Sequence, residues 1–119
     1  MKKHKYGAKK IKIDGILFDS KAEGLFYMLH KSNKNMKMQE TFILQDKFKL
    51  NGKSYRAINY KPDFTFYDEK GNLIKVVDVK GMILPEFRIK AKMFAKRYQI
   101  PITVAKKVKY KNSFIEQQI

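Results

Sequence analysis

The chain contains no cysteine, which excludes both a disulfide framework and a thiolate metal site. It has no apolar run approaching the roughly 18 residues of a membrane span, and its basic N-terminus lacks the apolar core of a signal peptide. Internal repeats, low-complexity segments and linkers are also missing. These absences favour a cytosolic protein without a membrane partner, with residues 11–119 forming one domain.

Acidic residues are scarce, with 11 Asp and Glu against 27 Lys and Arg, which gives a formal net charge of +16. Such an excess attracts a polyanion, and Lys and Arg contacts to phosphate supply most non-specific affinity for nucleic acid. Solubility alone is an alternative explanation, but it seldom requires so one-sided a charge. We therefore expect nucleic acid, rather than a membrane surface, as the partner.

The N-terminal part of the chain begins with a lysine-rich segment, residues 1–10, in which nothing is periodic. We expect it to be a flexible basic arm whose Lys9 and Lys10 either reach a phosphate backbone or stay in solvent. Asp14-Gly15 lies between two short apolar runs, which predicts a hairpin over residues 11–18.

A helix is predicted to begin at Ser20 and to end before residues 32–35. Its apolar stripe consists of Ala22, Leu25, Phe26 and Leu29. Glu23 lies three residues after Ser20, and this spacing by itself favours a capping box, in which each side chain bonds to the other residue's amide.

The middle of the chain is rich in strand signals. We expect a strand over residues 36–45 and a hairpin turning at Asn51-Gly52, whose second strand covers residues 55–60. Pro62 cannot donate a ladder hydrogen bond, which indicates a sheet edge or a bulge beside it.

Two β-rich runs that follow each carry an acid where an apolar residue is expected. The turn at residues 69–72 predicts that the runs pair antiparallel. Because side chains alternate along a strand, Asp78 and Lys80 share one face while Val77 and Val79 share the other. Asp63 lies in the partner strand, so two carboxylates and one amine can meet on one sheet.

The C-terminal part is predicted to hold a helix over residues 86–99, with Pro85 in its first turn. Its buried stripe is Phe87, Ala91, Phe94 and Tyr98. An exposed basic ridge, proposed to hold DNA phosphates, is formed by Arg88, Lys92 and Lys96. Residues 101–105 read as a last strand that could run parallel to an earlier one, followed by a basic and then polar ending with Phe114 and Ile115 as possible docking or dimer contacts.

The pattern Pro62-Asp63, then fourteen residues, then Asp78-Val79-Lys80 suits phosphodiester hydrolysis. That reaction uses a divalent ion to neutralise charge on phosphate and to lower the pKa of the attacking water. Asp63, Asp78 and the Val79 carbonyl would supply the oxygen ligands that Mg²⁺ prefers. Lys80 would orient the water or stabilise negative charge. The alternative is a cross-strand ion pair worth at most about 1 kcal/mol if exposed.

The sequence also resembles the PD-(D/E)XK nuclease superfamily, and most of all its small phage-encoded endonucleases and Holliday-junction resolvases. The resemblance spans about residues 6–105 and implies an α/β, restriction-endonuclease-like fold: a mixed central sheet flanked by helices, with an αβββαβ core. It is carried by Ser20-Lys21-Ala22-Glu23, Tyr60-Lys61-Pro62-Asp63-Phe64 and Val77-Asp78-Val79-Lys80-Gly81, followed by a lysine-rich helix.

The resemblance implies site roles for individual residues. Glu23 would be the acid supplied by the first helix, which favours a catalytic and metal-binding role for it over a cap. Asp63 and Asp78 would be ligands of Mg²⁺, for which Mn²⁺ could substitute, and Lys80 the catalytic lysine. There is no zinc-binding or helicase appendage, so targeting would come from the domain itself or from a homodimer, which suits paired cuts in a four-way junction.

We therefore expect a metal-dependent, structure-selective DNA endonuclease that resolves Holliday junctions or other branched DNA, encoded by a phage or prophage and acting in the host cytoplasm. A sequence-specific restriction or nicking endonuclease is an alternative, disfavoured because no recognition insert is evident. A non-catalytic, basic nucleic-acid-binding module is the other alternative, in which the acids only balance local charge.

Overall fold

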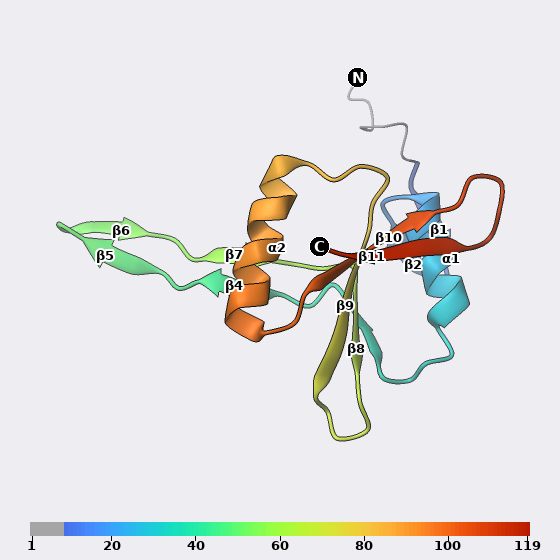
Figure 1. Cartoon of the computed structure of the whole chain (residues 1–119), viewed down its shortest axis with the longest axis horizontal. Coiled ribbons are helices and arrows are strands. Elements are labelled where there is room, and N and C mark those ends of the chain that lie inside the picture. Colours follow the sequence, from blue (N-terminus) through green and yellow to red (C-terminus); the bar gives the residue numbers. More distant parts are fainter. Residues whose placement is uncertain (1–8) are drawn as a thin grey trace.

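A five-stranded mixed sheet with one helix on each face forms the centre of the protein (Figure 1). The computed structural model describes residues 9–119. Listed along the sheet, the strands are β11 (Phe114–Gln118), β10 (Ile102–Lys107), β9 (Leu73–Val79), β8 (Phe64–Tyr67) and β3 (Met36–Met38). The helices are α1 (Lys21–His30) and α2 (Pro85–Tyr98). The fold is therefore the mixed α/β class predicted from the sequence.

Alternation along β9 assigns the two helices to opposite faces of the sheet. Val76 packs in a cluster with Phe94 of α2, whereas its neighbour Val77 packs in a second cluster with Phe26 of α1. All four side chains are fully buried. The period of two that placed Asp78 on the face opposite Val77 is thus confirmed.

Strand pairing confirms the predicted order of elements. β8 and β9 are antiparallel, with Phe64 opposite Val77, and β9 runs parallel to β10 across the α2 crossover. Elements α1, β3, β8, β9, α2 and β10 follow one another as the αβββαβ core requires.

Strand β11 was not predicted. It pairs antiparallel with β10 at the edge of the sheet. The Phe114 ring lies 5.3 Å from the Phe26 ring, edge to face, so it packs on the core and is not a free docking contact. Ile115 is 67% exposed.

The N-terminal hairpin, β1 (Ile11–Ile13) and β2 (Ile16–Phe18), covers α1. Its turn residues Asp14 and Gly15 both have positive φ, as an Asp-Gly turn requires. Gly24 is buried on α1 beneath this hairpin. Leu29, predicted to be buried, is 48% exposed, because the hairpin covers the side of α1 that carries Gly24.

Replacing Gly24 with leucine is expected to destabilise the protein by about 2 kcal/mol or more. A Cβ at this position would lie 2.8 Å from Ile13 Cδ1 and 3.0 Å from Ile11 Cγ2, so a leucine would displace the hairpin. Met28→Leu, at an exposed position of the same helix, is the matched control. Thermal unfolding should separate the two variants, and equal melting temperatures would contradict the packing described here.

The strand predicted over residues 36–45 is two strands in different sheets. β3 ends at Met38, Gln39 adopts a φ of 57°, and β4 (Phe42–Gln45) leaves the central sheet to pair with β7 (Ile58–Tyr60). The backbone N–H of Gln39 donates to the backbone carbonyl of Asp63, which holds the interruption between β3 and β4 beside the Pro62-Asp63 segment.

Beyond β4 and β7 the chain continues into the hairpin β5 (Phe48–Leu50) and β6 (Lys53–Tyr55), turning at Asn51-Gly52 as predicted. The strand predicted over residues 55–60 is interrupted, since residues 56 and 57 belong to no strand. We call residues 42–60 the ribbon arm, because it projects away from the central sheet (Figure 1). Neither α1 nor α2 is long and apolar enough to cross a bilayer.

Candidate active site

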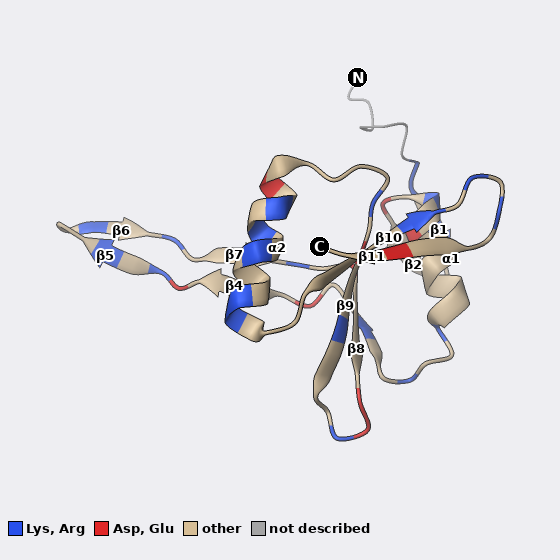
Figure 2. Ribbon diagram, viewed as in Figure 1, with Lys and Arg blue, Asp and Glu red and all other residues tan. Residues whose placement is uncertain are grey.

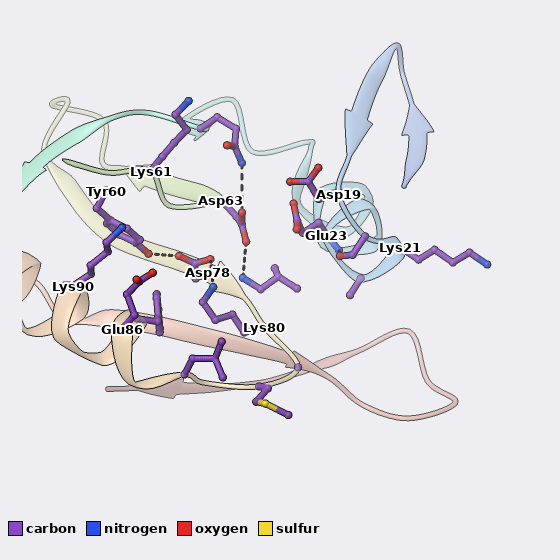
Figure 3. Close-up of a pocket in the computed structure, with 18 of the residues that line it drawn as sticks. Asp19, Lys21, Glu23, Tyr60, Lys61, Asp63, Asp78, Lys80, Glu86 and Lys90 are labelled. Atoms are coloured by element: carbon purple, nitrogen blue, oxygen red, sulfur yellow. Dashed lines mark hydrogen bonds and ion pairs between the residues drawn. The ribbon is translucent and has the colours of Figure 1, made fainter. Parts of the chain in front are cut away.

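A cleft of about 1220 Å³ lies at the end of β9, and all four predicted catalytic side chains line it. Asp63 immediately precedes β8, and Asp78 is the penultimate residue of β9. Because Phe64 is opposite Val77 in the ladder, Asp63 and Asp78 are neighbours across the two strands. Lys80 is the first residue after β9, and Glu23 reaches the cleft from α1 (Figure 3).

The carboxylate of Asp63 is held at both oxygens. Its Oδ2 accepts a hydrogen bond of 2.9 Å from the Val79 amide, and its Oδ1 accepts one of 3.4 Å from Gln39 Nε2. Asp63 is therefore oriented by Gln39, which lies between β3 and β4, and by Val79 at the end of β9. Dashed lines mark the hydrogen bonds of Asp63 in Figure 3.

Asp78 is almost completely buried, with 5% of the residue exposed. The Lys80 ammonium lies 3.5 Å from its Oδ1, and the Tyr60 hydroxyl donates to its Oδ2. Burial and the Asp78 charge raise the pKa of Tyr60 above its ordinary value, so this phenol remains a donor. Lys80 Nζ also lies 4.4 Å from the centre of the Phe87 ring, which positions it from the α2 side.

Glu23 contributes its backbone amide to the cap of α1 and its side chain to the lining of the cleft. Its backbone amide donates to Ser20 Oγ at 3.1 Å, so Ser20 caps α1. Its carboxyl group lines the cleft, where burial, followed by the charges of Asp19 and Asp78, raises the pKa to about 7. A cap made by the Ser20 side chain leaves the Glu23 side chain free for other contacts.

The acids of the cleft repel one another. Burial, the charge of Asp78 and the charge of Glu23 all raise the pKa of Asp63. Within residues 9–119, no three acidic or histidine side chains are close enough to form a ready-made metal-binding group. Asp63 and Asp78 therefore form an adjacent pair of acids and not part of a larger ligand cluster. Mg²⁺ commonly takes only one or two carboxylates and keeps several waters.

A family model described as "Protein of unknown function (DUF1064)" matches residues 3–112. This chain belongs to the DUF1064 family. Every residue that lines the cleft falls within the matched region. Comparisons with curated proteins and with solved structures gave no significant match.

Five lysines of this DUF1064 protein line the cleft: Lys9, Lys21, Lys61, Lys80 and Lys90. Lys9 was predicted to contact DNA from the basic arm. Lys10, the other arm lysine with this prediction, has its Nζ 3.9 Å from Asp19 Oδ1. The α2 ridge of Arg88, Lys92 and Lys96 is exposed as predicted but does not line the cleft. Residues 1–8 of the predicted arm lie outside the described residues.

Several polar residues that line the DUF1064 cleft were not predicted as site residues, among them Lys90, Tyr60 and Gln39. Lys90 lies three residues after Phe87, a helical spacing that could have placed it beside the buried stripe. Tyr60 precedes Pro62-Asp63 by two residues, but its bond to Asp78 depends on how β7 leads into the cleft. Gln39 gave no signal, because its contact with Asp63 requires an unusual backbone angle.

Replacing Asp63 with asparagine is expected to stabilise the metal-free DUF1064 protein at pH 8, raising the melting temperature by roughly 4 °C or more. The raised pKa means that the folded state holds this proton more tightly than the unfolded chain does. Stability from such an acid is complete below its usual pKa of 3.8 and is lost as pH rises through the folded-state pKa. The advantage of asparagine should therefore shrink toward pH 4.

Asp68→Asn is the matched control for this experiment. Hydrogen bonds from the Asn72 backbone and side chain lower the pKa of Asp68 in its turn, so the same change there should give no gain at pH 8. Melting curves of the three proteins in EDTA between pH 4 and pH 8 test this. Equal or lower stability of the Asp63 variant at pH 8 would contradict the repulsion among the cleft acids.

Proposed function

We propose that this cleft is the active site of a divalent-metal-dependent DNA endonuclease of the PD-(D/E)XK type, selective for branched DNA. One observation carries the proposal: Asp63 and Asp78 lie side by side in a cleft together with Lys80 and Glu23. The strongly basic composition, with a net charge of +16, supports a polyanionic substrate.

A purely structural ion pair accounts for less of the site. It explains Lys80 and Asp78, whose charges neutralise each other across 3.5 Å. It leaves Asp63 unexplained, because no Lys or Arg of residues 9–119 lies within ion-pair distance of this acid. Perturbed carboxyl groups that share a cleft are typical of functional sites.

The donor set fits Mg²⁺, with Mn²⁺ as a substitute. Asp63 and Asp78 would hold the ion, and the Val79 carbonyl would be a further ligand. Glu23, expected from the resemblance to be another ligand, lines the same cleft from α1 but does not form a group of three acids with them among residues 9–119. When bound, the ion would neutralise phosphate charge and lower the pKa of a water molecule.

The chain's own residues have separate tasks in this proposal. Lys80, held against Phe87 and beside Asp78, would place its ammonium against the negative charge that develops on the phosphate. Tyr60 would keep the Asp78 carboxylate in one orientation. The Glu23 carboxyl, whose pKa is about 7, can take up or release a proton near neutral pH.

Lysines at the cleft and on α2 would hold the phosphates on either side of the cut. Since contacts to the backbone carry little sequence information, selectivity would come from DNA shape. Symmetric cuts in a four-way junction would require a homodimer, in which the two-fold axis pairs the two sites.

The test compares a labelled four-way junction with a linear duplex of matching sequence, each with Mg²⁺ and with EDTA. We expect nicks near the branch point that depend on Mg²⁺ and are rare in the duplex. Binding without cutting in both Mg²⁺ and Mn²⁺ would support a non-catalytic binding module instead. Cutting of the duplex at one sequence would support a restriction or nicking enzyme.

A further inference from the structure

Within residues 9–119, no further layer of structure packs behind the tip of the ribbon arm. Figure 1 shows β5 and β6 extending well past α2, away from the five-stranded sheet. All three residues of β5 are exposed, including Phe48 at 43% and Leu50 at 56%. A two-stranded ribbon alone in water is marginally stable, so its persistence here needs a cause.

Two features stiffen the arm. The Phe48 ring stacks on the Tyr55 ring across the two strands, with centroids 4.6 Å apart and an interplanar angle of 5°. At the base, Arg97 of α2 bonds to both carboxylate oxygens of Asp46, and the Tyr98 hydroxyl donates to the Ile43 carbonyl. The arm is therefore attached to α2 in a defined direction.

The distal part of the arm carries charge of one sign only. Residues 47–56 contain four cationic and no acidic side chains, and all four are exposed; they are Lys47, Lys49, Lys53 and Arg56. Figure 2 shows Lys and Arg along both strands of the ribbon. Asp46, the acid nearest to this stretch, is already paired with Arg97.

The arm begins at the cleft itself. Thr41, Asn59, Tyr60 and Lys61, at the two ends of the arm, all line the cleft. Tyr60 also bonds to Asp78. A nucleic acid whose backbone enters the cleft would consequently pass along the arm.

We propose that the ribbon arm binds in the major groove of the DNA duplex that flanks the cleaved bond, an inference that rests on the proposed function. The major groove, about 12 Å wide, admits a two-stranded β-ribbon. At roughly 3.3 Å per residue, each strand from residue 47 or 56 to the turn spans about 15 Å, more than the depth of the groove. A second copy of the chain is a poorer occupant, because two arms of this charge would repel each other.

The test removes three arm charges and compares the result with an equal change elsewhere. The arm variant is Lys47→Gln with Lys49→Gln and Lys53→Gln. The control variant changes three exposed lysines around the β10–β11 loop, at the other end of the molecule from the arm in Figure 2: Lys106, Lys109 and Lys111. Binding of a fluorescent 20-base-pair duplex is measured in EDTA over a range of salt concentrations.

We expect the arm variant to bind about tenfold more weakly or worse at 100 mM salt and to lower the salt slope by about 2 to 3, while the control changes by less than about threefold. Dimethyl sulfate, which methylates guanine N7 in the major groove, should also show protection by the wild-type protein that the arm variant lacks. Unchanged circular dichroism melting curves would establish that both variants are folded, and Lys53→Gln alone provides a milder substitution.

Several results would overturn the proposal. These are equal losses in the two variants, unchanged guanine protection, absence of duplex binding by the wild-type protein, or a shift from dimer to monomer in the arm variant, which would indicate a protein interface. The nuclease proposal fails separately. DNA binding that depends on the arm, without any cutting in Mg²⁺ or Mn²⁺, would contradict the nuclease proposal and support DNA binding by the arm. Cutting by the wild-type protein, together with normal DNA binding by the arm variant, would support the nuclease proposal and contradict DNA binding by the arm.

Discussion

Replacing Asp78 with asparagine is expected to reduce metal-dependent strand cleavage by about 10³-fold or more, because the change removes a ligand charge at the centre of the cleft. DNA binding in EDTA should persist or tighten, since one negative charge leaves a phosphate-binding surface. The substitution keeps the size of the side chain and an oxygen able to accept the Tyr60 hydrogen bond. Single-turnover cleavage of the four-way junction in Mg²⁺ measures the effect.

Asp19→Asn is the matched control, because Asp19 lines the same cleft but its side chain is 81% exposed. We expect its cleavage rate to stay within a few-fold of the wild-type rate. Cleavage by the Asp78 variant at a comparable rate would remove Asp78 from the catalytic centre. Loss of DNA binding by the Asp78 variant would instead indicate a structural role.

Replacing Lys80 with methionine is expected to lower kcat by about 10² to 10³-fold with little change in KM. Methionine has a side chain of similar length but lacks the ammonium, which lies 4.4 Å from the centre of the Phe87 ring and 3.5 Å from Asp78 Oδ1. An interaction made mainly in the transition state affects kcat, whereas a ground-state phosphate contact affects KM.

Lys90→Met separates these two cases, because Lys90 lines the same cleft from α2. We expect it to raise KM several-fold with kcat nearly unchanged. Steady-state kinetics on the junction at several salt concentrations would compare the two variants. If Lys80→Met behaved like Lys90→Met, Lys80 would be a phosphate contact and not a catalytic residue.

The acid pair and its lysine could be predicted because they depend on local rules. The period of two along β9 assigns Asp78 and Val77 to opposite faces, and the turn before β9 fixes the antiparallel pairing that brings Asp63 to Asp78. The Asn51-Gly52 turn and the α2 stripe follow from equally local signals. The core of the fold and the centre of the cleft were therefore available from the sequence.

What the sequence missed depends on contacts between distant segments. The break at Gln39 relies on a positive φ and on a bond to Asp63, and no local pattern signals either. The sequence of the ribbon arm predicts strands but not the sheet to which they belong. Among the described residues, its strands pair only with one another, and this pairing depends on contacts between distant segments. A sequence-specific restriction or nicking endonuclease was disfavoured because no recognition insert was evident, and the strands of the ribbon arm do lie outside the central sheet.

Glu23 illustrates a limit of spacing arguments. Its position three residues after Ser20 favoured a capping box, and only the resemblance to the nuclease superfamily favoured a site acid. The two roles use different atoms: the Glu23 amide donates to Ser20 Oγ, while the carboxyl group faces the cleft. A capping motif near a cleft thus does not exclude a functional side chain.

The most direct test of the central claim is to locate Mn²⁺ by its anomalous scattering in crystals of the protein grown with that ion. We predict a peak in contact with carboxylate oxygens of both Asp63 and Asp78, on the side of the cleft that faces Glu23, and its loss in the Asp78→Asn variant. A cleft that stays without a peak at millimolar Mn²⁺, or an ion bound only elsewhere, would contradict a metal-dependent active site at this position.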